Sequence, residues 1–228
     1  MIYIVIGVVV FAVVMFFMSI FNSHKTIVKL YNKYMNIKNE ENAKGSQIAF
    51  FAAKIFGLKV KVAKTRGLLT DGYSPKGRLV ILSEEVCDNA SIASAAIVAH
   101  EMGHAVQHKN KSLLFRLNYF LRRFCRIFCK FALPCFILGG VLYWCGFDID
   151  TGYVMLIISL VLVLLNIFQK LIEIPLEKNA SDIGYKFLTD YNLVSKWNAR
   201  KVKKLLKVAG RTYTAEFFRQ LLPIRRNF

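Results

Sequence analysis

Long stretches without charge constrain the fold of this chain more than any other feature. Residues 1–22 contain no charged side chain, and two further apolar stretches cover about residues 131–147 and 152–168. About 20 apolar residues in a helix span the roughly 30 Å hydrocarbon core of a bilayer. Hydrophobic residues make up 55% of the chain, and the mean hydropathy is +0.40. The sequence therefore predicts a mainly α membrane protein with three transmembrane helices.

The first stretch has the features of a retained anchor. A cleaved signal peptide begins with basic residues and ends at a small-residue cleavage site. Here the first lysine, Lys25, follows the apolar stretch, and no Ala-x-Ala pattern ends it. The other two stretches are nearly free of charge and are joined by a short acidic patch at residues 148–150, so we expect a membrane hairpin rather than a buried hairpin of a soluble core.

The basic residues predict the topology. Of the 32 lysines and arginines, 19 lie in residues 25–130 and 13 lie in residues 170–226. Because positive residues next to membrane segments stay in the cytoplasm, we expect both blocks there and the acidic patch outside. The localisation that follows is a plasma membrane, with several crossings and both basic blocks on the cytoplasmic side.

The net charge of +18 also fits a nucleic-acid-binding adaptor. However, the basic residues flank membrane segments, where they attract acidic lipid, and no stacking or groove-binding motif accompanies them. We therefore expect a lipid bilayer as a partner and no nucleic acid.

Residues 100–104 read His-Glu-Met-Gly-His and match the HExxH pattern of zinc metalloproteases. Residues four apart share one face of a helix, so His100 and His104 can bind one zinc ion while Glu101 acts as a general base. Residues 88–99 supply helix caps (Asp88, Asn89 or Ser91) and then small apolar side chains. A chance match is the alternative, but unpaired polar groups in such apolar surroundings are costly, which favours zinc.

His108 lies one turn further along the same face and competes as a third ligand. Its backbone would lie about 12 Å from that of His100, and no glycine turns the chain back as in the longer metzincin pattern. We expect His108 beside the site or facing solvent. Three acids after the third apolar stretch, Glu173, Glu177 and Asp182, remain as sources of the third ligand.

Two short β-rich stretches precede the motif. Residues 58–64 alternate apolar with basic side chains, residues 78–83 form the second stretch, and the turn residues between them predict a hairpin with a long tip. The second stretch either binds an extended substrate at a sheet edge or only packs against the motif helix. A helix over residues 47–56, capped by Ser46 and ended by Gly57, is expected before them.

Residues 113–130 mix aromatic and arginine side chains, as a helix at a membrane interface does. The five cysteines include no CxxC pair, and we expect them to be small packing residues. Cys125 and Cys129 lie four apart, but no further ligand is near them in sequence, so we expect no second metal site.

The HEMGH motif, Pro-Leu-Glu-x-x-Ala-Ser at residues 175–181 and Leu-Thr-Asp-Gly-Tyr-Ser-Pro at residues 69–75 make the chain resemble the YugP-like family of bacterial membrane zinc metallopeptidases over essentially its full length. The resemblance implies a gluzincin, in which two histidines of the motif and a later glutamate bind zinc, and it implies Glu177 as that glutamate. Lys178 and Asn179 replace the usual Phe-Asp of the family, and Gly72 stands where the family usually has histidine.

We therefore expect a membrane-embedded zinc endopeptidase that acts on peptides or membrane proteins. The resemblance implies that it lies in a bacterial plasma membrane, crosses it several times and has a cytoplasmic active site. Zinc on His100, His104 and Glu177 would activate a water, and Glu101 would move its proton to the leaving amine. Glu173 and Asp182 are weaker candidates as ligands, and Asp182 is also a candidate to orient a histidine. Tyr73 and Tyr213 are the candidates for the donor of a hydrogen bond to the oxyanion. The alternative is a non-enzymatic scaffold or adaptor with a structural zinc.

Four segments follow from these expectations. They are a transmembrane anchor (1–22), a cytoplasmic, small α+β zincin-like metalloprotease region with the motif (23–130), a transmembrane hairpin (131–169) and a cytoplasmic helical region that supplies the third ligand (170–228).

Overall fold

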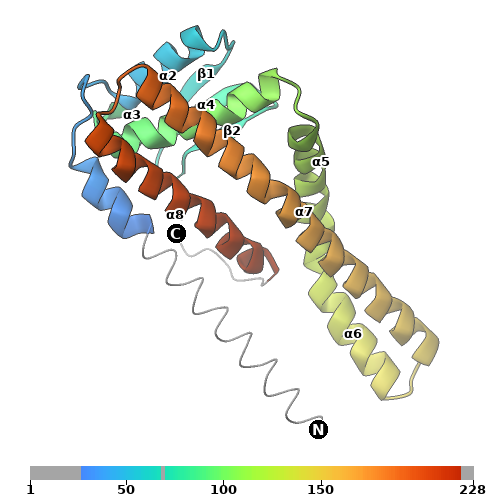
Figure 1. Cartoon of the computed structure of the whole chain (residues 1–228). Coiled ribbons are helices and arrows are strands. Elements are labelled where there is room, and N and C mark those ends of the chain that lie inside the picture. The colour runs from blue at the N-terminus through green and yellow to red at the C-terminus, as the bar shows by residue number, and fades with distance from the viewer. Residues whose placement is uncertain (1–26, 68–69, 222–228) are drawn as a thin grey trace. The chain divides into compact units, whose positions relative to one another are not determined.

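The computed structural model describes residues 27–67 and 70–221, with side chains up to residue 209 (Figure 1). The first predicted span, residues 1–22, lies outside the described residues. The chain divides into two compact units. Unit 1 consists of Met1–Lys111 and Glu177–Ala215, and unit 2 consists of Ser112–Leu176 and Glu216–Phe228.

The described residues are mostly helical, with one small mixed sheet. Residues 27–35 are helical and precede the labelled elements. In chain order these are α2 (Gly45–Ile55), β1 (Lys61–Thr65), β2 (Gly72–Ser74), β3 (Leu79–Ser83), α3 (Glu84–Asp88), α4 (Ile92–Lys109), α5 (Leu113–Phe128), η1 (Cys129–Phe131), α6 (Ala132–Trp144), α7 (Ile149–Asp190) and α8 (Lys196–Leu221).

The three strands of unit 1 lie in the order β1-β3-β2. β1 runs parallel to β3, and β2 runs antiparallel to β3 with Tyr73 opposite Val80. The predicted hairpin between residues 58–64 and 78–83 is therefore wrong. The segment expected to form the tip of this hairpin contains β2. A turn joins β2 to β3, so these two strands form the hairpin. The role of β3 as an edge strand is also wrong, because β3 is paired on both sides.

The helix over the motif is confirmed as α4. Its N-cap is Ser91, whose hydroxyl accepts a hydrogen bond of 3.0 Å from the backbone N–H of Ser94. Ala95, Val98 and Met102 have no exposed surface. α4 is thus the central helix of the core of unit 1, which holds the motif rigidly.

Small residues allow α4 to pack closely against the C-terminal part of α7, and Figure 1 shows these two helices side by side. A Cβ atom on Gly103 would overlap the carbonyl oxygen of Ala180, and one on Gly184 would lie 2.6 Å from the carbonyl oxygen of Ala99. The backbones of the two helices therefore touch, and this contact positions Glu177 opposite the motif.

α2 begins earlier than predicted. Its N-cap is Lys44, whose backbone N–H donates a hydrogen bond of 2.8 Å to the side-chain oxygen of Gln47, so the expected cap at Ser46 is wrong. Gly57 follows the helix with a φ of 58°, a left-handed conformation that glycine adopts without strain. The predicted end of the helix is confirmed.

Two segments of the described chain are long and apolar enough to cross a membrane; the first lies in unit 2, and the second begins in unit 2 and ends in unit 1. They are Leu113–Trp144, which comprises α5, η1 and α6, and Ile149–Asp190, which is α7. Only 22% and 17% of their most apolar windows are buried, whereas the core helix of a soluble protein is mostly buried. Among the described residues, two of the three predicted spans are thus present as candidate membrane helices.

Candidate functional site

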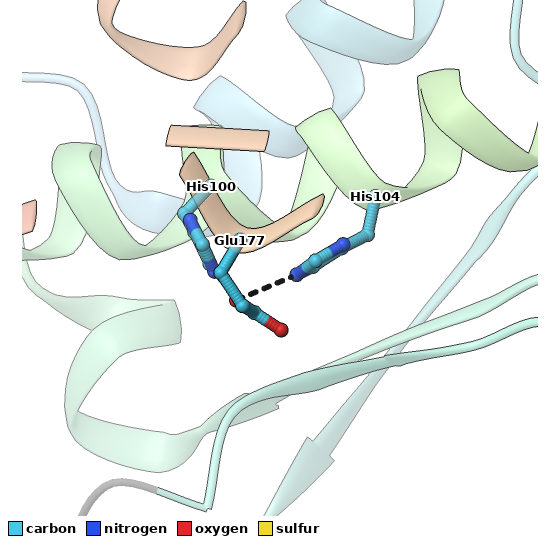
Figure 2. Close-up of side chains that lie close together, drawn as sticks. All are labelled: His100, His104 and Glu177. Carbon is cyan, nitrogen blue, oxygen red and sulfur yellow. Dashed lines mark ion pairs between the residues drawn. The ribbon is translucent and has the colours of Figure 1, made fainter. Parts of the chain in front are cut away.

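Three side chains of unit 1 converge between α4 and α7. Nε2 of His100 lies 3.2 Å from Oε2 of Glu177, and Nε2 of His104 lies 3.3 Å from the same oxygen. Figure 2 shows the two imidazoles and the carboxylate pointing toward one another. The side chains are 8%, 15% and 8% exposed, respectively. The local helical spacing brings the two histidines together, whereas the packing of α4 on α7 brings Glu177 to them.

The chemistry and the spacing of these donors fit a zinc ion. Two imidazole nitrogens and one carboxylate oxygen are zinc ligands that leave a fourth position open, as in catalytic sites. Tetrahedral bonds of about 2.0–2.1 Å place ligand atoms about 3.3 Å apart, which is close to the two distances above. One potential ligand atom from each residue lies within 4.8 Å of the others.

The second nitrogen of each imidazole has its own partner. Nδ1 of His100 lies 3.1 Å from the hydroxyl of Ser181, and Nδ1 of His104 lies 3.1 Å from Oε1 of Gln107. The amide nitrogen of Gln107 donates a hydrogen bond of 2.9 Å to Oδ1 of Asn179. These contacts orient the rings so that Nε2 of each faces Glu177.

The sequence alone did not identify Gln107, Asn179 and Ser181 as the residues that contact the imidazoles or their partners. Gln107 lies one turn after His104, and Ser181 lies one turn after Glu177, so the helical spacing was the available signal. It could not show which helix faces are in contact. The role of orienting a histidine falls to Ser181, whereas Asp182 is exposed.

Glu101 is buried on α4, with 6% of its surface exposed. A second carboxylate, that of Asp71, lies just before β2. The backbone N–H of Ser83 donates a hydrogen bond of 2.7 Å to Oδ1 of Asp71, and the hydroxyl of Ser83 donates one of 3.3 Å to Oδ2. Burial raises the pKa of Asp71, the hydrogen bonds from Ser83 oppose this, and the charge of Glu101 raises it further. The predicted general base therefore lies close enough to Asp71 for the two charges to interact.

The pKa of His104 is raised. Burial alone would lower it, but the hydrogen bond to Glu177 and the charges of Glu177 and Glu101 more than compensate. The surroundings of His104 are thus arranged to stabilise positive charge at this point, which is what a site for a cation requires.

His108 is not one of the three converging side chains of the described residues. Its Nδ1 lies 2.7 Å from the hydroxyl of Tyr73 on β2. Burial and the charge of Arg78 lower the pKa of His108, which keeps the imidazole neutral at pH 7. His108 thus pairs with Tyr73, and its expected position beside the ligands stays a prediction. The side chain of Tyr213 lies outside the described side chains.

Glu173 has different partners. It lies in unit 2, forms an ion pair with Arg122, and lies 2.5 Å from Nζ of Lys170. Among the described residues, Glu177 is thus the acid that meets the two motif histidines, and the alternative of Glu173 as a ligand is not supported.

Comparisons with known proteins point to a zinc peptidase family. Residues 5–227 match the family described as "Putative neutral zinc metallopeptidase". The chain is 30% identical over 200 residues to a protein of Bacillus subtilis (strain 168) named "Putative membrane protease YugP", and this alignment covers 86% of the chain and 84% of the relative. No solved structure matches the chain. Zinc is the cofactor that the family description implies. The chain therefore belongs to this family of zinc metallopeptidases.

Proposed function

We propose that the protein is a membrane-embedded, zinc-dependent endopeptidase of the gluzincin type. The convergence of His100, His104 and Glu177 carries this proposal, since it joins two histidines of one helix to a glutamate of a later helix. Glu101 has no structural need to be a glutamate on a buried helix, which favours a catalytic role over a purely structural zinc. We also propose that unit 1 has a zincin-like fold.

His100, His104 and Glu177 would hold the ion. Bound zinc supplies Lewis-acid chemistry, which polarises a carbonyl group and lowers the pKa of a water. Glu101 takes the proton of the attacking water and returns it to the leaving amine. Ser181 and Gln107 keep the imidazoles in the orientation that metal binding needs.

The pair of Tyr73 and His108 is the proposed hydrogen-bond donor to the substrate. His108 lies one helical turn after His104 on the same face of α4, and its neutral imidazole can accept the proton of the Tyr73 hydroxyl at Nδ1. Nε2 then carries the proton, and this is the tautomer in which His108 would donate to a carbonyl or an oxyanion. Tyr73 thus acts mainly by selecting the tautomer of His108.

The proposed setting is a plasma membrane with several crossings and a cytoplasmic site. Its support is the apolar stretch of residues 1–22, the two candidate spans and the two basic blocks. Substrates would be peptides or membrane proteins that reach the inner face. Cys145, an exposed residue at the end of α6, would then lie outside the cell.

The topology is tested by labelling intact cells with a membrane-impermeant maleimide. A variant with Cys145 as its sole cysteine should be labelled without permeabilisation. A cysteine-free variant with Asn110→Cys, a change just after α4, should be labelled only after permeabilisation. The reverse pattern would place the metal site outside the cell.

The activity is tested with full-length protein purified in detergent, by measuring zinc content and cleavage of unfolded casein. Glu101→Gln should retain zinc and lose cleavage, whereas His100→Ala and Glu177→Ala should lose both. Cleavage by Glu101→Gln protein would contradict the assignment of the base. Zinc without cleavage in the wild type would favour the non-enzymatic scaffold.

A further inference from the structure

α5 and the η1 turn that continues it, residues 113–131, form one helical segment that presents three different faces along its length. The first face is buried against the rest of unit 2 and consists of Asn118, Leu121, Cys125 and Cys129, which are 9%, 8%, 6% and 4% exposed. The steps of three and four residues between them follow one stripe of a helix. The other two faces of α5 therefore point away from the unit.

The second face is cationic. Arg116, Arg123, Arg126 and Lys130 recur at steps of seven, three and four residues, and all four are exposed. Among the described side chains, no carboxylate forms an ion pair with any of them. The acid of unit 2 at this end of the hairpin, Glu173, is engaged by Arg122 and Lys170. The cationic face thus keeps its charge available for a partner outside the chain.

The third face is apolar and equally exposed. Leu113, Phe120, Ile127 and Phe131 recur at steps of seven, seven and four residues, and they are 78%, 65%, 47% and 49% exposed. Such a row of large apolar side chains beside a cationic row is the pattern of a helix that lies at a membrane surface. α5 also continues directly through η1 into α6, within one candidate membrane span.

We propose that α5 binds the headgroups of acidic phospholipids in the inner leaflet, with its cationic face on the phosphates and its apolar face among the acyl chains. Arginine suits this role because its guanidinium group makes paired hydrogen bonds to phosphate oxygens. The ion pairs of the buried Glu173 support this position at the membrane boundary. Glu173 is 2% exposed, yet it binds Arg122, whose side chain is 44% exposed. This ion pair holds a further arginine of α5, Arg122, beside the cationic face.

This binding would enrich acidic lipid around the protein. Each lysine or arginine near an acidic membrane surface raises the local occupancy of acidic lipid roughly fivefold, and this effect falls off within a Debye length. The inference requires unit 2 to lie in a bilayer, but it does not require peptidase activity. Its failure would leave the zinc content and casein cleavage of the protein unchanged.

The test places one fluorophore on α5 of the full-length chain. Phe120→Trp in a Trp144→Phe, Trp197→Phe background supplies a sole tryptophan on the apolar face. The protein is reconstituted in nanodiscs of phosphatidylcholine with phosphatidylglycerol at a fixed ratio. The bromine label that quenches tryptophan is carried either by the phosphatidylglycerol or by an equal amount of the phosphatidylcholine. Both samples then have the same lipid composition.

Quenching by brominated phosphatidylglycerol should exceed quenching by brominated phosphatidylcholine about twofold or more, and the excess should shrink in high salt because the Debye length falls to about 3 Å at 1 M. Neutralising the cationic face with Arg116→Gln, Arg123→Gln, Arg126→Gln and Lys130→Gln should abolish the excess. A matched control neutralises four basic residues of α8 in unit 1, Arg200, Lys203, Lys204 and Lys207, and should keep it.

Equal quenching by the two lipids in the parent protein would overturn the proposal, whatever the variants do. An equal loss in the control would also overturn it, since general positive charge would then explain the enrichment. Inorganic phosphate at millimolar concentration should not remove the excess quenching. If it did, the cationic face would bind a free anion rather than lipid headgroups, and the proposal would be wrong. If the fourfold variant fails to fold, Arg123→Gln and Arg126→Gln alone should each reduce the excess.

Discussion

Oε1 of Gln107 lies 3.1 Å from Nδ1 of His104, while the amide nitrogen of Gln107 donates to Asn179. Because the amide nitrogen is occupied by Asn179, the amide oxygen faces His104 and accepts the proton of Nδ1. In the neutral imidazole Nε2 of His104 then carries no proton, which leaves its lone pair for a metal ion. A neutral chain of two amides thus selects the tautomer of a proposed metal ligand.

Gln107→Leu should weaken zinc binding by about 10- to 100-fold, because the leucine cannot accept the proton of His104 Nδ1. Gln107→Glu retains an acceptor oxygen and should bind zinc more tightly than Gln107→Leu. Competition with a chromophoric chelator measures both affinities. Equal affinities of Gln107→Leu and the wild type would show that the contact does not orient the ring.

Gly103→Ala should force α4 away from α7, since a Cβ at this position would overlap the carbonyl of Ala180. Overpacking of this kind costs about 1–3 kcal/mol, and the shift should also reduce zinc content because it separates Glu177 from the histidines. The thermal unfolding midpoint and the bound zinc are the measurements. Gly140→Ala is the control, since a Cβ there meets no atom within 4 Å, and it should not lower stability. Equal effects of the two changes would argue against the tight contact.

Removal of zinc by a chelator should lower the unfolding midpoint, because the ion would join α4 to α7 in the folded state alone. A ligand at 100 times its Kd stabilises a fold by about 2.7 kcal/mol. Re-addition of zinc should restore the midpoint in the wild type and leave that of Glu177→Ala unchanged. A zinc-dependent shift of the same size in Glu177→Ala would move the site elsewhere.

Tyr73→Phe should reduce kcat/KM about tenfold or more and leave zinc content unchanged, because His108 loses the contact that selects its tautomer. Tyr191→Phe removes the same hydroxyl from an exposed position just after α7 and should have no effect. Peptide cleavage and metal analysis of the same preparations separate the outcomes. Loss of zinc in Tyr73→Phe would indicate a structural role instead.

Asp71→Asn should gain stability relative to the wild type as pH rises. Burial and the charge of Glu101 raise the pKa of Asp71 above its usual value near 3.8, although the hydrogen bonds from Ser83 oppose this. An acid whose folded-state pKa is raised contributes stability that is present below its unfolded pKa and is lost as pH rises through the folded pKa. Unfolding midpoints of both proteins between pH 4 and 7 test the sign. A constant difference across this range would contradict it.

The sequence pattern was sufficient to predict the elements that depend on neighbouring residues alone. The motif helix followed from its cap and its spacing, because backbone geometry alone places residues four apart on one face. The two candidate membrane helices followed from apolar length, because the width of a bilayer sets the length of a helix that can cross it. The residues alone left three acids open as the third ligand, and only the resemblance to a family favoured Glu177.

Contacts between distant segments needed the tertiary structure. The order β1-β3-β2 depends on a three-residue strand, Gly72–Ser74, which is too short to show a periodic pattern. The meeting of Glu177 with the histidines depends on Gly103 lying against Ala180, and the partners of the imidazoles depend on the same helix contact. Helix periodicity says which residues share a face. Which two faces meet is decided by packing, where the absence of one Cβ atom lets two backbones touch.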